Sequence, residues 1–281
     1  MNKTTVFNKR VSRSSNRKSP ERIYRRDAVS FDGTKKTNNP QVLTKPIDVM
    51  KRFELKYILS PEQEAFLKER LKGHMKVDDF GLTTIASLYY DTPDRRLINA
   101  SIEKPLFKEK LRLRSYGMAT DYSAVFLELK RKAYDVVYKR RVQSTVSSVN
   151  DFFAGRHGIG DDGQISREIT YFRDFYKNLV PSCLIIYDRT AYYEPEGDVR
   201  LTIDQNPRYR VEKLDLCSSM DGIPLLSKGY SILEIKVQQS VPMWLSEILS
   251  EGKIYKSSFS KYGEAYRQQL QNAHGKERQY V

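Results

Sequence analysis

Basic side chains occupy every second position in several segments of this chain. In residues 107–116, Lys110, Arg112 and Arg114 alternate with leucines. Successive side chains of a β-strand point to opposite faces, so this spacing predicts a strand with one cationic and one apolar face. The same alternation assigns further residues to polar strand faces: Glu54 and Lys56; Glu128, Lys130 and Lys132; Lys139 and Arg141; Tyr187 and Arg189; Arg200, Thr202 and Asp204; Glu234 and Lys236.

These faces suit the binding of linked phosphates. An Arg side chain offers a planar fork of donors that grips two phosphate oxygens, and a Lys side chain offers a compact charge. Aligned cations repel one another, so clustering them costs stability unless an anion is regularly present. The alternative is the solvent face of an antiparallel sheet, where Lys, Arg and Glu are common. Repetition over six or more strands favours the phosphate hypothesis.

Isolated glutamates accompany the cations and predict a metal site. Glu234, with Glu128 or Glu54 beside it, could bind a divalent ion, Mn2+ or Mg2+, that bridges phosphate oxygens, because such ions favour carboxylate and water ligands. The alternative for each Glu is a salt bridge to a neighbouring Lys or Arg. Both interpretations stay open on the residues alone.

Eight segments show the period-two pattern of strands, and helical segments lie between them. If the strands close into a barrel, the apolar faces point outward under the helices and the charged faces point inward. The expected strands lie near 52–58, 83–90, 107–116, 124–131, 135–143, 183–192, 198–204 and 230–238. The expected helices run from Ser60-Pro61 to about Lys72, from near Ser166, from Pro242, and from about Ser260 toward Gln271.

The net charge of +14 comes mostly from one end of the chain. The sequence has 49 Lys and Arg against 35 Asp and Glu, and residues 1–46 hold twelve of these bases and three of these acids. With few large apolar residues, 1–46 is predicted to be a disordered basic tail, and 276–281 a short C-terminal tail. The basic tail is a solvated leader or a tether to a polyanion or a membrane surface. The sequence fixes no oligomeric state.

Hydropathy and cysteine content indicate a soluble protein. No stretch approaches the roughly 18 to 20 apolar residues that cross a bilayer, and the first residues lack the apolar core of a signal peptide. Cys183 and Cys217 have no metal-type spacing and predict ordinary thiols in a reducing compartment. We therefore expect a cytoplasmic protein without a transmembrane segment.

Nine strings occur in an order that resembles a known family. They are RFELKY, LYYDTPD, KEKLRLRSYG, FLELKRK, YKRRV, YDRTAYY, RLTID, ILEIK and SSFSKYG. Together they are similar to the polyphosphate polymerase (VTC-type) domain of the triphosphate tunnel metalloenzyme superfamily. The match covers about residues 50–270, within an expected domain of 47–275. The resemblance implies an α+β fold in which an eight-stranded antiparallel β-tunnel, a closed barrel with a polar, basic interior, is surrounded by helices.

The resemblance also implies an activity and the residues that carry it. The polymerases of this family make inorganic polyphosphate from ATP with a divalent metal. The implied catalytic residues are Lys56, Arg112, Arg114, Lys130, Lys139, Arg189, Arg200, Lys236 and Lys261. The implied substrate-binding residues are Arg141, Tyr187 and Ser260, and the implied metal ligands are Glu234, Glu128 and Glu54.

One departure from the superfamily pattern bears on the reaction. Its hydrolase branch begins with Glu-x-Glu-x-Lys, whereas Arg52 stands here at the first acidic position, before Glu54 and Lys56. This favours a polymerase, with a tripolyphosphatase or nucleoside triphosphatase of the same fold as one alternative. The other alternative is a non-catalytic binder of polyphosphate or nucleic acid. Nucleic acid is not the expected partner, because Glu54, Glu128 and Glu234 lie among the Lys and Arg side chains of these faces.

Overall fold

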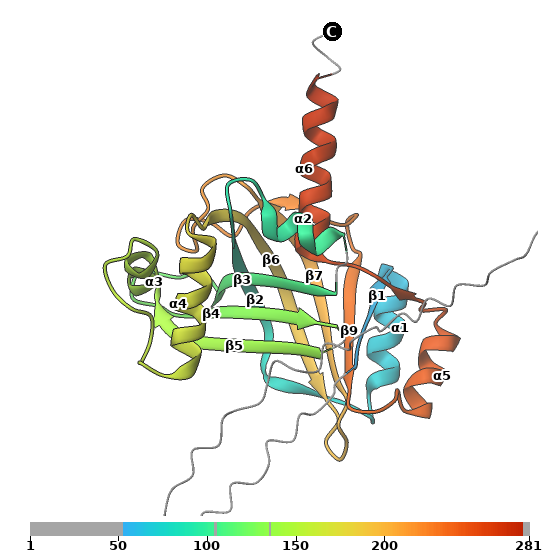
Figure 1. Ribbon diagram of the computed structural model, residues 1–281. Coiled ribbons are helices and arrows are strands. Elements are labelled where there is room, and N and C mark those ends of the chain that lie inside the picture. The colour runs from blue at the N-terminus through green and yellow to red at the C-terminus, as the bar shows by residue number, and fades with distance from the viewer. Residues whose placement is uncertain (1–52, 104–105, 135, 278–281) are drawn as a thin grey trace, which may run out of the picture. The chain divides into compact units, whose positions relative to one another are not determined.

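The computed structural model of the protein describes residues 53–103, 106–134 and 136–277, all within one compact unit, Val49–Val281 (Figure 1). The strands described are β1 (Phe53–Leu59), β2 (Lys76–Asp91), β3 (Phe107–Tyr116), β4 (Ala124–Ala133), β5 (Val136–Thr145), β6 (Val180–Tyr193), β7 (Arg200–Arg210), β8 (Ile223–Pro224), β9 (Ser231–Val237) and β10 (Lys256–Ser257). The helices are α1 (Pro61–Leu71), α2 (Arg96–Ile102), α3 (Val146–Phe153), α4 (Gln164–Tyr176), α5 (Met243–Glu251) and α6 (Lys261–Glu277). The predicted basic tail, 1–46, lies outside the described residues.

All these strands form one antiparallel sheet. Its order is β10-β1-β9-β7-β6-β2-β3-β4-β5, with β8 paired to β7. The prediction of an antiparallel α+β fold is confirmed. The prediction of a closed eight-stranded barrel is wrong, because the sheet has ten strands and no described ladder joins β5 to the opposite edge. That edge is taken by β10, whose residues Lys256 and Ser257 pair with β1.

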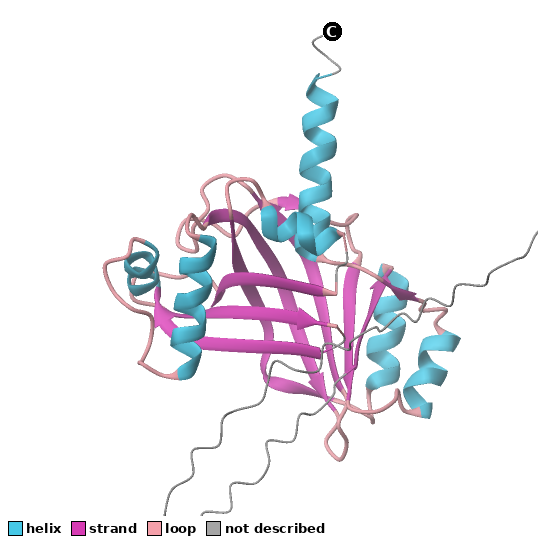
Figure 2. Cartoon of the chain, in the orientation of Figure 1, coloured by secondary structure: helices cyan, strands magenta, loops and turns pink. Residues whose placement is uncertain are grey.

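The apolar face of the sheet lies under helices, as predicted. Leu111, Leu127 and Leu129 of β3 and β4 pack against Phe152 of α3 and Ile169 of α4. A second core joins β1, β7 and β9 to α1 and α5. In Figure 2, α3 and α4 lie beside β3–β5, whereas α1 and α5 lie beside β1. The helices therefore cover both ends of one face and leave the basic side chains on the other.

One end of the opposite face is also apolar. Tyr187, Ile185 and Ile232 pack there with Phe259 and Tyr262, which precede and begin helix α6. These side chains form a packed wall beside the basic residues. No helix in the described part of the chain is long and apolar enough to cross a membrane.

The predicted elements are confirmed with shifted ends. The start of α1 has the expected capping box, in which the Gln63 amide donates to Ser60 Oγ at 3.2 Å and the Ser60 amide donates to Gln63 Oε1 at 3.0 Å. Strand β2 begins seven residues before the predicted position, across an irregularity near Gly81, whose φ is +57°. Helices α2 and α3 and the two-residue strands β8 and β10 were not predicted.

Candidate functional site

The register of the sheet places the predicted site residues on a single face. Lys56 lies opposite Glu234, and Lys236 lies opposite both Glu54 and Arg200. We call this surface the basic face. It comprises Glu54, Lys56, Lys110, Arg112, Arg114, Glu128, Lys130, Lys139, Arg141, Tyr187, Arg189, Arg200, Thr202, Asp204, Glu234 and Lys236, and Lys261 reaches it from α6.

A first cluster surrounds two buried carboxylates, Glu234 and Asp204. Glu234 lies 3.2 Å from Lys56 Nζ, 3.7 Å from an Arg189 guanidinium nitrogen and 3.8 Å from Lys261 Nζ. Arg189 also donates two hydrogen bonds to Asp204, at 2.5 and 2.7 Å, and Lys261 donates to the same carboxylate. Two acids are thus held by three cations from three different elements.

The electrostatics of this cluster favour ionised carboxylates. Burial alone would raise the pKa of Glu234, but Lys261, Lys56 and Arg189 outweigh burial and hold that pKa well below its usual range. Burial and the surrounding cations act on Asp204 in the same opposed way, and its pKa is also lowered. Both groups are therefore anions at neutral pH.

A second cluster surrounds Glu128, whose side chain is 1% exposed. Its carboxylate lies 2.7 Å from Lys139 Nζ, 2.8 Å from Arg112 Nε, 3.6 Å from Arg141 Nε and 3.9 Å from Arg114 Nε. Burial would raise the pKa of Glu128, but Arg112, Arg114 and Lys139 lower it to about 2. These contacts make Glu128 the counter-charge that allows four cations to gather.

Tyr187 lies between the two clusters. Its hydroxyl accepts a hydrogen bond from Arg114 at 3.2 Å, and its ring lies 4.5 Å from Lys261 Nζ and 5.0 Å from the Arg189 guanidinium carbon. Ser260 caps helix α6, because its hydroxyl accepts from the Gly263 amide at 3.2 Å. That cap holds the first turn of α6 where Lys261 reaches the first cluster.

The remaining predicted residues line the same face at greater exposure. Arg200 lies beside Lys236 in the register and 5.5 Å above the Tyr193 ring. Burial, with Arg189 and Lys130 nearby, lowers the pKa of Lys236 despite the opposing effect of Glu234. Lys130 extends toward Glu54, with 4.0 Å between its Nζ and the carboxylate. The structure therefore brings the predicted site residues other than Ser260 to one surface, and the roles of all of them stay predictions.

Comparison with known families identifies this fold. A model of the VTC domain matches residues 51–270. The chain belongs to the VTC domain family. The predicted family is thereby confirmed.

Known proteins with similarity to this VTC domain fall into two groups. Vacuolar transporter chaperone complex subunit 4 of Schizosaccharomyces pombe is 24% identical over 246 residues, which cover 69% of this chain and 34% of that protein. The chain thus spans about a third of that relative's length. A solved structure of a candidate adenylate cyclase from Vibrio parahaemolyticus has a TM-score of 0.46 and 13% identity, covering 77% of this chain and 98% of its own. HpAC1 from Hippeastrum, a candidate adenylyl cyclase described with a dominant triphosphatase activity, has a TM-score of 0.46 and 19% identity over 74% of this chain and 92% of its own.

Two residues of the VTC domain site were missed as functional candidates. Asp204 appeared only as part of a strand pattern, and its fully buried carboxylate organises Arg189 and Lys261. Lys110 lies on the basic face, 5.9 Å from the Tyr262 ring centroid, and no described carboxylate forms an ion pair with it. Alternation placed both side chains on the polar face, but the sequence carried no signal that Asp204 is buried and Lys110 half-buried.

The family implies a divalent metal, and the residues near Glu234 fit one. Among the described residues, no group of three or more His, Cys, Asp or Glu could hold a metal alone. Mg2+ and Mn2+ commonly use one or two carboxylates and complete their shell with phosphate oxygens and water. Glu234 and Asp204 supply such oxygens, and Thr202, opposite Glu234, has a buried Oγ1 without a hydrogen-bond partner in the described structure. This donor set suits a metal shared with bound phosphates.

Proposed function

We propose that this VTC domain is a metal-dependent polyphosphate polymerase that transfers the terminal phosphoryl group of ATP to a growing chain of inorganic polyphosphate. The observation that carries the proposal is the basic face with its two acid-centred clusters. A solvent face would not require three buried carboxylates, Glu234, Asp204 and Glu128, to hold the cations together, whereas a polyanion site needs a high density of cations at rest. ATP and inorganic polyphosphate are the proposed partners.

The proposed reaction needs no protein nucleophile and no general base. A terminal oxygen of polyphosphate attacks the γ-phosphorus of ATP, the bond to the β,γ-bridging oxygen breaks, and ADP leaves with that electron pair. The attacking oxygen is already ionised near neutral pH, so no proton has to be removed from it. The protein's contribution is to align polyphosphate with the triphosphate of ATP and to neutralise the charge of both.

The clusters divide that work. Arg112, Arg114 and Arg189 present guanidinium groups that can grip phosphate oxygens in pairs. Lys139 and Lys261 lie next to the buried acids and can turn from those carboxylates to the attacking and leaving oxygens.

Glu234, with Asp204 beside it, would hold the divalent ion. When bound, that ion supplies further positive charge to the phosphate oxygens. Bringing two polyanions together requires this extra charge, because the cations of the face are partly offset by its own carboxylates.

The proposal is tested by incubating the purified chain with ATP and Mn2+. Long chains resolved on a gel are the expected product, and orthophosphate is measured in the same samples. Arg112→Ala should reduce synthesis at least tenfold. Arg156→Ala, which removes an exposed Arg that follows α3 and pairs with Asp151 of that helix, should leave synthesis unchanged. Mg2+ replaces Mn2+ in a parallel series.

The same assay separates the alternatives. Orthophosphate without long chains would show a triphosphatase. Tight binding of tripolyphosphate without turnover would show a non-catalytic binder, and binding of single-stranded RNA in place of tripolyphosphate would show a nucleic-acid protein. A cytoplasmic location and a membrane-surface role for residues 1–46 stay predictions.

A further inference from the structure

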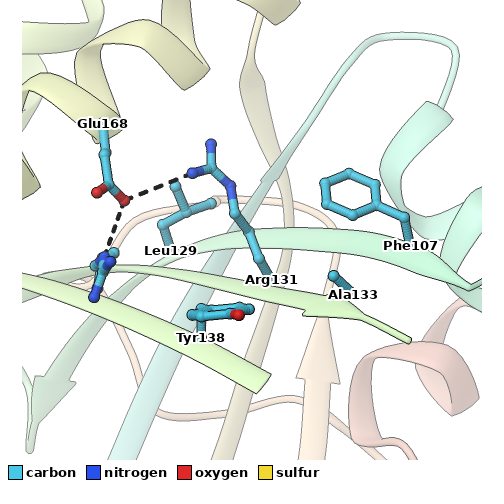
Figure 3. Close-up of a pocket in the computed structure, with 7 residues that line it drawn as sticks. Phe107, Leu129, Arg131, Ala133, Tyr138 and Glu168 are labelled. Carbon is cyan, nitrogen blue, oxygen red and sulfur yellow. Dashed lines mark hydrogen bonds and ion pairs between the residues drawn. The ribbon is translucent and has the colours of Figure 1, made fainter. Parts of the chain in front are cut away.

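A pocket of about 280 Å3 lies on the face of the sheet opposite the basic face (Figure 3). It opens beside α4, over the outer side chains of β3, β4 and β5. Phe107, Leu129, Arg131, Ala133, Tyr138, Arg140 and Glu168 line it. Because side chains alternate along each strand, these residues point away from the proposed catalytic residues of the same strands.

The chemistry of the pocket favours an apolar side chain over a free anion. Glu168 accepts from Arg140 at 2.9 Å and lies 3.6 Å from Arg131, so both guanidinium groups are already paired (Figure 3). Arg131 is also paired with Glu109. What remains is an apolar floor at Leu129 and an aromatic wall on each side.

Exposed apolar side chains surround this pocket. Phe107 is 53% exposed, Tyr138 is 46% exposed and Tyr134 is 72% exposed. Val136 continues the same outer row on β5, and Leu106 precedes Phe107. Such a cluster of exposed aromatic and aliphatic side chains is typical of a protein-binding surface.

The outer edge of β5 adjoins the pocket. β5 is the last strand of the sheet order, and no described strand pairs with that edge. An unpaired edge offers a row of backbone donors and acceptors to an added strand. Tyr138 and Arg140 belong both to this edge strand and to the pocket.

The charge of β5 determines what can pair with it. Lys139, Arg140 and Arg141 are consecutive, and Lys139 and Arg141 point to the basic face. A second copy of β5 would bring like charges opposite each other, and residues 1–46 carry twelve bases against three acids. An acidic partner is the complement, with apolar side chains on its outer face beside Tyr138.

We propose that an extended segment of an acidic partner protein adds to the outer edge of β5 and inserts an apolar side chain into this pocket. Backbone hydrogen bonds to β5 would supply affinity, and the pocket would supply specificity. The segment would alternate acidic residues, next to Lys139 and Arg141, with apolar residues, next to Val136 and Tyr138. This binding is no step of the polymerase reaction, although Lys139 and Arg141 belong to both surfaces.

The test uses defined synthetic peptides and the full chain without added tripolyphosphate, so that Lys139 and Arg141 remain available to the acidic residues of the peptide. The probe is a labelled nonapeptide in which Glu alternates with Val and one central Trp. The first control has the same composition in block order and therefore the same charge, and the second has Lys in place of Glu. The alternating peptide should bind at least tenfold more tightly than either, with slower amide exchange along β5.

Two outward-facing variants locate the binding. Tyr138→Ala and Phe107→Ala should each remove most of the tenfold advantage of the alternating peptide while leaving tripolyphosphate affinity unchanged. Tyr171→Ala on α4, which removes a 66% exposed aromatic ring away from the pocket, should have no effect. Equal binding of all three peptides, or an unchanged advantage in the Tyr138→Ala variant, would overturn the proposal.

Two other results would assign the surface to a different occupant and equally overturn the proposal. A dimer of the unliganded chain that dissociates on Tyr138→Ala substitution would show that a second copy covers β5. Peptide binding that occurs only after deletion of residues 1–46 would show that this chain's own basic segment does so.

Discussion

Glu54 on β1 and Lys130 on β4 lie 4.0 Å apart, although five strands separate β1 from β4 in the order of the sheet. The sheet is therefore curved enough for its two sides to approach through their side chains. The pKa of Glu54 reflects this approach, since burial would raise that pKa but Lys130 and Lys56 lower it. The two sides of the basic face therefore approach through side chains even though the backbone ladder between them stays open.

A double-mutant cycle measures this approach. Glu54→Gln and Lys130→Met should together destabilise the protein by less than the sum of the single changes. Both side chains are partly exposed, so we expect a coupling of about 0.5 kcal/mol at low salt that is lost near 1 M salt. Urea unfolding gives the four free energies of unfolding. Glu69→Gln with Lys130→Met is the matched control and should be additive; zero coupling for Glu54 and Lys130 would contradict the curvature.

Glu128→Gln should destabilise the free protein strongly. The change removes the counter-charge of Arg112, Arg114, Lys139 and Arg141 and leaves their mutual repulsion, a loss of about 3 kcal/mol in the free energy of unfolding. Added tripolyphosphate should restore most of the loss, since it supplies anions to the same groups. Thermal melts with and without tripolyphosphate test this. If the Glu128→Gln variant without tripolyphosphate melted at the same temperature as the unmodified chain, Glu128 would not be needed to offset the repulsion of these cations.

The pH dependence of stability follows from the pKa of the Glu128 carboxyl. Its folded-state pKa of about 2 lies below the ordinary 4.5, so its contribution is fully present above pH 4.5 and is lost as pH falls toward 2. The Glu128→Gln variant should therefore show a shallower loss of stability over this window.

The sequence predicts the strands and their polar faces well, because a period-two pattern is local. The sequence could not predict whether the sheet closes, because that depends on which strand pairs with the outer edge of β1. Lys256 and Ser257 take it, and two residues carry no strand signal. Helix α2 was missed for a related reason. The backbone amides of Leu97 and Ile98 donate hydrogen bonds to the Asp91 carboxylate at 2.8 and 3.0 Å. The capping side chain therefore lies well before the helix in the sequence.

The candidate site shows the same limit. Alternation assigned Asp204 and Lys110 to the polar face but could not say which polar residues become buried. Burial depends on the curvature of the whole sheet and on the position of α6, and that helix brings Lys261 to Asp204 and Tyr262 to Lys110. These contacts join segments far apart in the sequence.

Glu234→Gln should weaken Mn2+ binding in the presence of tripolyphosphate by at least tenfold. The amide keeps the shape of the side chain but removes the anionic ligand that would hold the metal. Titration calorimetry with Mn2+ reads this without turnover. Glu247→Gln, on α5 outside the basic face, is the control.

A charge-reversing Glu234→Lys change is less informative, because a fourth cation beside Lys56, Arg189 and Lys261 should also destabilise the fold. Unchanged Mn2+ affinity in Glu234→Gln would remove Glu234 from the metal site.

Lys110→Met should make the protein more stable and a poorer polyphosphate binder. Burial, reinforced by Lys108 and Lys130 and opposed by Tyr89, lowers the pKa of Lys110 to about 8. The unfolded chain, with a pKa near 10.5, holds this proton more tightly, so stability rises with pH between about 8 and 10.5. At pH 7 the half-buried ammonium is a cost, and Met should recover about 1 kcal/mol in the free energy of unfolding.

Affinity should move in the opposite direction. A bound phosphate chain would stabilise the protonated ammonium of Lys110, so binding near pH 8.5 should take up a proton. Calorimetry in buffers of different ionisation enthalpy should detect this uptake, and Lys110→Met should lack it while binding tripolyphosphate about tenfold more weakly. Lys110→Arg, which keeps the charge at every accessible pH, should bind well but without proton uptake. If Lys110→Met lowered both stability and affinity, Lys110 would be a structural residue. A cation whose role is to bind an anion destabilises the protein as long as no anion is bound, so removing it should raise stability.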